Sequence, residues 1–189
     1  MASYYWDLGF DFNAVQVTVP GTNNMVSFLQ NGFVSMESTG HEPAAPVNLN
    51  TGDTFAFNAF NVTSAGGAMP DGTQMISGTI TFQNADGNQP VASPFNDQRI
   101  TANDNGTATM TIDSGSIGTT QQTSPSIIFS GGTNPQVEFP VWNIVPPAAP
   151  LVAATNGRFL MTVSLNVQSP GGAPQNFVVD PEMIFGSAG

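Results

Sequence analysis

Apolar and polar residues alternate in several short stretches of this chain, and the alternation predicts β-strands. Clear examples are residues 14–19, 54–60 and 76–82, each with Pro, Gly or Asn close by, and we expect them to be half-buried strands. The fifteen prolines and twenty glycines leave little room for long helices. Weaker patterns predict further strands near residues 26–36, 107–113, 126–130, 136–144, 158–168 and 177–185.

This spacing of short strands and turn residues predicts an all-β protein. We expect residues 1–189 to form a single domain, an antiparallel β-sandwich of the jelly-roll or Greek-key type, with a β-barrel as the alternative. The proline-rich segment 145–150 is interpreted as a stiff crossover between the two sheets, because the chain that follows it is too short for a second core without cysteines.

The charge balance narrows the set of partners. Thirteen Asp and Glu residues face only Arg99 and Arg158, and the formal net charge is -11. Nucleic acids and anionic membrane surfaces are bound by clusters of Lys or Arg, so we expect neither as a partner. With only 8% charged residues, the surface must consist mainly of Asn, Gln, Ser and Thr.

The distribution of apolar residues also bears on location. No stretch reaches the length and hydrophobicity of a membrane helix, and no signal-peptide pattern begins at Met1. We therefore expect no membrane insertion and predict a cytoplasmic protein. Secretion by a route that needs no signal peptide is the alternative.

An oxygen-rich stretch suggests a metal. Asp97, Asn103, Asp104 and Asn105 offer carboxylate and amide oxygens, which are hard ligands suited to calcium. The competing interpretation is a tight hairpin turn at Asn105-Gly106, and we favour it because the spacing matches no EF-hand loop. Apart from this possible calcium ion, no cofactor is expected.

An aromatic cluster opens the chain. Tyr4, Tyr5 and Trp6 have flat faces that can stack on a neutral carbohydrate or insert into a neighbouring subunit. Packing on the protein's own core is the favoured alternative. The single histidine, His41, has no Gly-x-Ser-x-Gly element to accompany it, so we interpret it as a loop residue and assign no catalytic residues.

Three segments, in order, resemble the bacterial inclusion-body protein family (PixA/AidA-like). They are residues 33–40, residues 47–55 with the sequence Gly52-Asp53-Thr54, and residues 179–184 with Asp180-Pro181. The resemblance implies a cytoplasmic, abundant and non-catalytic protein that accumulates in inclusions.

Two functional hypotheses from different classes follow. The first is a non-enzymatic structural or storage protein that self-associates into a homo-oligomer, because a surface with little charge apart from scattered acids offers weak long-range repulsion once those acids are neutralised. The second is a carbohydrate-binding module or lectin, with or without a requirement for calcium.

Overall fold

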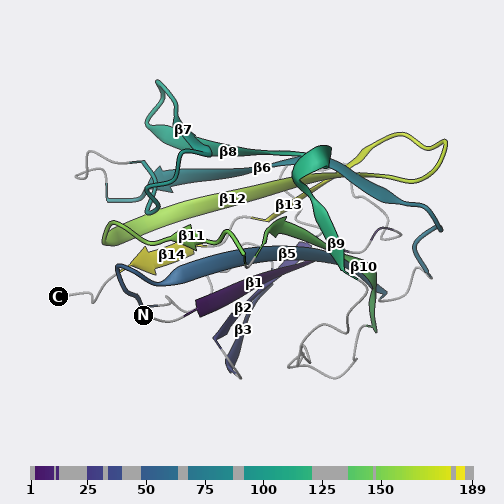
Figure 1. Ribbon diagram of the computed structural model, residues 1–189, viewed down its shortest axis with the longest axis horizontal. Coiled ribbons are helices and arrows are strands. Elements are labelled where there is room, and N and C mark those ends of the chain that lie inside the picture. The colour runs from purple at the N-terminus through teal and green to yellow at the C-terminus, as the bar shows by residue number, and fades with distance from the viewer. Residues whose placement is uncertain are drawn as a thin grey trace.

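Two β-sheets account for most of the chain in the computed structural model, which describes residues 3–10, 12, 25–31, 34–39, 48–63, 68–86, 92–120, 136–146, 148–179 and 182–185. Figure 1 shows the sheets as two layers, with β6, β8 and β12 above β1, β2 and β5. Neither sheet closes into a barrel within these residues, so the predicted all-β sandwich is confirmed and the barrel alternative is wrong.

The first sheet has the strand order β3-β2-β1-β5-β10-β9, and β11 also pairs with β5. Most neighbours are antiparallel, as predicted, but β1 and β5 run parallel. The strands are β1 (Ser3–Phe10), β2 (Met25–Asn31), β3 (Val34–Thr39), β5 (Thr54–Thr63), β9 (Gly118–Thr120), β10 (Gln136–Val145) and β11 (Leu151–Val152).

The second sheet has the order β4-β14-β12-β6-β8-β7, and β13 also pairs with β12. One pair, β4 with β14, is parallel. A short 3₁₀ helix, η1 (Ser114–Ser116), follows β8. The strands are β4 (Asn48–Leu49), β6 (Gln74–Asn84), β7 (Ile100–Ala102), β8 (Thr107–Asp113), β12 (Gly157–Gln168), β13 (Gln175–Val179) and β14 (Glu182–Phe185).

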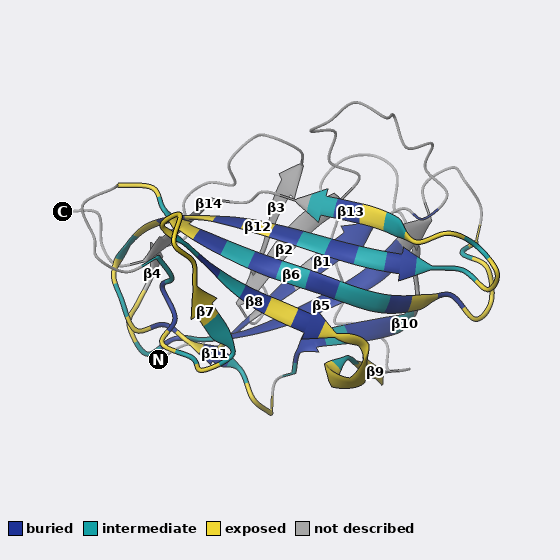
Figure 2. Cartoon of the chain, turned by 90° about the horizontal axis from the view of Figure 1, so that it is seen from above, coloured by how far each residue is buried: buried dark blue, intermediate teal, exposed yellow. Residues whose placement is uncertain are grey.

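The core lies between the two layers and follows from the period of two along each strand. On β12 every second side chain is buried, from Phe159 to Val167, and the intervening ones face outward (Figure 2). On β1 the alternating residues Tyr4, Trp6, Leu8 and Phe10 are buried.

Many of the predicted strands are confirmed. The stretches at 54–60, 76–82, 107–113, 136–144 and 158–168 lie within β5, β6, β8, β10 and β12. The stretches at 26–36 and 177–185 each contain two strands: β2 and β3 pair with each other, and β13 and β14 both pair with β12. The predictions at 14–19 and 126–130 fall outside the described residues.

The prediction that 54–60 is half-buried is wrong. Phe55 and Phe57 face the main core, but Ala56 and Phe60 on the opposite face of β5 are also buried. In contrast, β6 is half-buried as predicted, with Ile80 and Phe82 inward and Thr79 and Thr81 partly exposed. The central strand of the first sheet is therefore covered on both faces, whereas the central strand of the second sheet is open on one.

Segment 145–150 was also misinterpreted. It connects β10 to β11, and both of these strands pair with β5 in the first sheet. The chain passes to the second sheet only after β11, beyond Ala153, which forms an isolated bridge with Phe95. Ala149 N donates to Pro146 O, so Pro146 belongs to a turn between two strands of one sheet.

The Gly52-Asp53-Thr54 motif is a tightly bonded strand entry. Asp53 is buried, and its Oδ2 accepts a hydrogen bond from Asn50 N at 2.9 Å. Gly52 N donates to Ala153 O at 2.7 Å, and Ala153 N donates to Asp53 O at 2.9 Å. Gly52 has φ of 93°, a conformation that favours glycine. The motif anchors the start of β5 to the end of β11.

Candidate functional site

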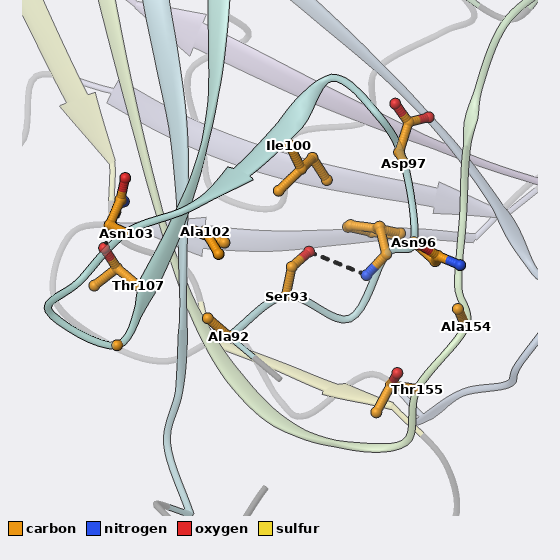
Figure 3. A pocket seen from close by; sticks show the side chains of 13 residues that line it. Ala92, Ser93, Asn96, Asp97, Ile100, Ala102, Asn103, Thr107, Ala154 and Thr155 are labelled. Atoms are coloured by element: carbon orange, nitrogen blue, oxygen red, sulfur yellow. Dashed lines mark hydrogen bonds between the residues drawn. The ribbon is translucent and has the colours of Figure 1, made fainter. Parts of the chain in front are cut away.

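A pocket of about 620 Å³ lies beside the edge strand β7 (Figure 3). Its lining comes from the inward side of β7 and β8, from residues 92–97, and from residues 154–155. One part of the lining is apolar and the rest offers hydroxyl, amide and carboxylate groups. The apolar residues include Phe95, Ile100, Ala102 and Ala108, and the polar ones are Ser93, Asn96, Asp97, Asn103, Thr107 and Thr155.

The loop segment that forms one side of the pocket is held at several points. The ring of Phe95 packs edge-on against Phe55 and Phe82, with centroid distances of 5.4 Å to each. Phe95 N donates to Ser93 Oγ at 3.1 Å, the dashed line in Figure 3. Pro94 O accepts hydrogen bonds from Ala154 N and Thr155 N. These contacts fix this side of the pocket to the core and to the chain after β11.

The carboxylate in the lining belongs to Asp97 and is bound by Arg99. Arg99 Nε donates to Oδ1 at 2.8 Å, Arg99 Nη2 donates to Oδ2 at 2.7 Å, and Arg99 N also donates to Oδ1. This hydrogen bonding from the Arg99 side chain lowers the pKa of Asp97, against a smaller opposing effect of burial. Asp97 is therefore ionised at neutral pH, with both oxygens engaged.

The residues predicted with Asp97 as calcium ligands form the β7–β8 turn. Asn103 N donates to Thr107 O at 2.8 Å, and Gly106, with φ of 78°, donates from its N to Asn103 O. Asn105 Oδ1 accepts from Thr107 N and Oγ1, while Asn103 Nδ2 donates to Thr107 and Thr109. The hairpin turn predicted at Asn105-Gly106 is thus present.

The predicted calcium ligands do not converge. Figure 3 shows Asp97 and Asn103 at opposite sides of the pocket, and Asp104 and Asn105 are exposed turn residues outside its lining. Within the described part of the chain there is no group of three or more His, Cys, Asp or Glu side chains that could hold a metal ion. The geometry favours the turn interpretation over the calcium site.

The aromatic residues near the N-terminus pack inside the sandwich. Tyr4 stacks on Phe55 with ring centroids 5.1 Å apart, and Trp6 stacks on Phe57 at 5.6 Å. Both side chains are buried, and burial together with the charge of Asp53 raises the pKa of Tyr4. This placement matches the core alternative rather than a sugar-stacking surface. The side chain of Tyr5 lies outside the described residues, as does His41.

A second surface of interest is the outer face of the second sheet. Most of its side chains are hydroxyls and amides, although Leu160 and Val178 also lie on this face. Thr101, Thr109, Thr81 and Thr162 form one row across β7, β8, β6 and β12. We call the set the hydroxyl face. It comprises Ser77, Thr79, Thr81, Thr101, Thr109, Thr111, Thr162, Ser164, Asn166 and Asn176.

Side-chain hydrogen bonds connect neighbouring strands on this face. Asn166 Nδ2 donates to Ser77 Oγ at 3.0 Å, and Asn176 Nδ2 donates to Ser164 Oγ at 2.7 Å. The hydroxyls of Thr81 and Thr109 are 3.4 Å apart. Figure 2 looks onto this face, and no described segment crosses β6, β8 or β12 in that view. The hydroxyl face is therefore an open and internally ordered polar surface.

Charged side chains stand at the margins of the hydroxyl face. Arg158 lies at the start of β12, with its Nη1 3.9 Å from Asp86 Oδ1, and Asp113 lies at the far end of β8. The row next to Arg158 has Glu182 of β14 opposite Leu160, whereas the two central rows, those of Thr162 and Ser164, hold no charged residue. In a protein with a net charge of -11, this makes the centre of the face a neutral region.

No helix among the described residues is long and apolar enough to cross a membrane. The chain matches no protein-family model, no curated protein and no solved structure.

Proposed function

We propose that this protein is a non-enzymatic structural or storage protein that self-associates, and that the hydroxyl face is the surface through which two copies meet. The observation that carries the proposal is the absence of charge across the central rows of that face in a strongly acidic protein. The kinship with inclusion-body proteins and a cytoplasmic location stay predictions that agree with this function.

The charge distribution supports a second copy of this chain as the partner on the hydroxyl face. Two identical molecules with a net charge of -11 repel each other, and the repulsion is strongest where acids of one copy face acids of the other. The central rows of the hydroxyl face carry no acid, and Asp86, Asp113 and Glu182 lie at positions around them. Thr methyl groups can pack at such a contact, while hydroxyls and amides exchange hydrogen bonds with water for bonds to the partner.

The size of the face sets the expected strength of association. Its strands lie about 4.8 Å apart and its rows about 6.7 Å apart, so the face measures roughly 20 Å by 20 Å. An area of this order lies at the small end of specific protein interfaces. We therefore expect weak, reversible association that depends on protein concentration.

The pocket supports a non-enzymatic function. Its carboxylate, Asp97, has a lowered pKa because Arg99 binds it, so it is a poor proton donor near neutral pH. The whole chain has no Cys and no Lys, two of the residue types that act as nucleophiles. Apart from the carboxylate of Asp97, which Arg99 binds, the polar groups of the pocket lining are neutral hydrogen-bonding groups.

A charge placed on the hydroxyl face tests the proposal. Thr162→Glu introduces a carboxylate on β12 at an exposed position in the threonine row. The matched control is Thr119→Glu on β9, an exposed threonine of the first sheet, which adds the same charge elsewhere. Sedimentation velocity over a range of concentrations gives the association constant of each variant.

We expect Thr162→Glu to weaken association at least tenfold and Thr119→Glu to change it little, because only the first charge meets its own copy across the interface. Equal weakening by both variants would mean that net charge alone controls association, and the hydroxyl face would lose its assignment.

A further inference from the structure

We infer that the pocket beside β7 binds a neutral polyhydroxylated ligand of monosaccharide size, and that it does so without a metal ion. The pocket lies on the inward side of β7, whereas Thr101 on the same strand faces outward. This inference is therefore independent of the self-association proposal.

Size and the distribution of polarity favour a sugar ring. A volume of about 620 Å³ falls within the range of small-molecule sites. Ile100, Ala102 and Ala108 offer an apolar wall from β7 and β8, against which the C–H face of a sugar ring can pack. Asn96 and Thr155, from two other segments, offer polar groups to hydroxyls at the ring edge.

The charges near the pocket disfavour charged ligands, and the polar lining disfavours apolar ones. An anion would need a cation, but the Arg99 guanidinium is engaged by Asp97 through two hydrogen bonds. A cation would need carboxylate oxygens, and both oxygens of Asp97 are engaged by Arg99. A purely apolar ligand would remove water from the amides and hydroxyls of the lining without replacing their hydrogen bonds.

Several polar groups of the lining are available to a ligand. Within the described residues, the side-chain amide of Asn96 and the hydroxyl of Thr155 form no intramolecular hydrogen bonds. Asn103 uses its Nδ2 within the β7–β8 turn, which leaves its Oδ1 as an acceptor. Donors and acceptors are thus both present, and this combination suits hydroxyl groups, which act as both.

The test measures binding of four neutral sugars to the full chain: glucose, galactose, mannose and N-acetylglucosamine. Saturation-transfer NMR detects weak binding, and titration gives the Kd for each sugar. Each measurement is repeated with a chelator present. We expect at least one sugar to bind with a Kd in the millimolar range or tighter, unchanged by the chelator.

Variants locate the binding site. Ala102→Trp fills the pocket from an exposed position on the edge strand, and Ala173→Trp, at an exposed alanine outside the lining, is the matched control. Asn96→Ala removes one amide while leaving the apolar wall intact. We expect Ala102→Trp to abolish binding, Asn96→Ala to weaken it about tenfold, and Ala173→Trp to leave it unchanged.

Three results would overturn the inference: no binding by any of the four sugars, loss of binding in the chelator, or full binding by both Ala102→Trp and Asn96→Ala. Circular dichroism confirms that each variant is folded. If Ala102→Trp does not fold, Asn96→Ala decides the question, since an exposed amide is not required by the core.

Discussion

Arg99 binds both carboxylate oxygens of Asp97, two residues before it in the chain, and adds a third hydrogen bond from its backbone N–H. Asp97, a candidate calcium ligand in the sequence, is thus the hydrogen-bonded partner of one of the two arginines in the protein. It also fixes the loop that forms one side of the pocket.

The Asp97–Arg99 pair makes stability depend on pH. The pair holds the pKa of Asp97 below its ordinary value of 3.8, so its contribution to stability is present above that value and is lost as the pH falls through the lowered pKa. Because both side chains are partly exposed, we expect Asp97→Asn to lower the free energy of unfolding near neutral pH by only about 1 kcal/mol.

Urea denaturation of the wild type and of Asp97→Asn, near neutral pH and at about pH 2, measures this effect. The difference between the two proteins should shrink at the lower pH. A difference that stays constant would show that the ionised carboxylate is not what stabilises the loop.

Gly106 provides the left-handed conformation of the β7–β8 turn. Its φ is 78°, and a Cβ built there meets nothing within 4 Å, so Gly106→Ala changes backbone strain alone. We expect a loss of stability of about 1 to 2 kcal/mol. Gly115→Ala, also in open space but without a positive φ, should have little effect in the same thermal melts. Equal effects of the two substitutions would argue against a strained turn.

Gly78 is a packing requirement inside the second sheet. A Cβ at this position would lie 2.8 Å from Leu165 Cδ2 and 2.9 Å from Ser164 O, and the second of these is a backbone atom. We expect Gly78→Ala to destabilise the protein by about 1 to 3 kcal/mol through overpacking. In a protein that already carries Leu165→Ala, Gly78→Ala should lower the free energy of unfolding by less than it does in the wild type, because the Leu165 side chain is no longer in the way. Additive effects of the two changes would contradict this packing.

Asp53 is expected to contribute strongly to stability. It is 1% exposed, and its Oδ2 accepts the backbone N–H of Asn50 at the entry to β5. Asp53→Ala leaves that donor without its partner, so we predict a loss of about 1 to 3 kcal/mol in urea denaturation. Thr51→Ala, in the same turn but exposed, should cost much less. Similar losses for both would show that the turn does not depend on the buried carboxylate.

The strands were predictable where alternation was clear, as in residues 76–82 within β6, and less so elsewhere. Tyr4, Trp6, Leu8 and Phe10 recur at every second position, and this pattern indicates β1, although the aromatic residues were interpreted as a cluster and no strand was predicted there. The double burial of β5 was not predictable, because alternation reports one covered face and cannot show what packs on the other.

The candidate sites depend on register and on contacts distant in the chain. Thr79 and Thr81 are visible as an alternating pair, but their alignment with Thr109 and Thr162 follows from strand pairing, which the sequence does not specify. The last row of the face pairs Asn166 with Ser77, and the register of β12 against β6 shifts directly after it, between Asn166 and Val167. The pocket likewise joins Asn96 to Thr155, segments that meet through the Phe95–Ala153 bridge.

The most direct test of self-association is the molar mass of the wild-type protein by light scattering, over a range of concentrations near neutral pH and near the isoelectric point of about 4.1. We predict that the mass rises above the 19.7 kDa of one chain as concentration increases, and rises further near the isoelectric point, where the acids are partly neutralised. A mass of one chain at every concentration and pH would contradict the proposed function.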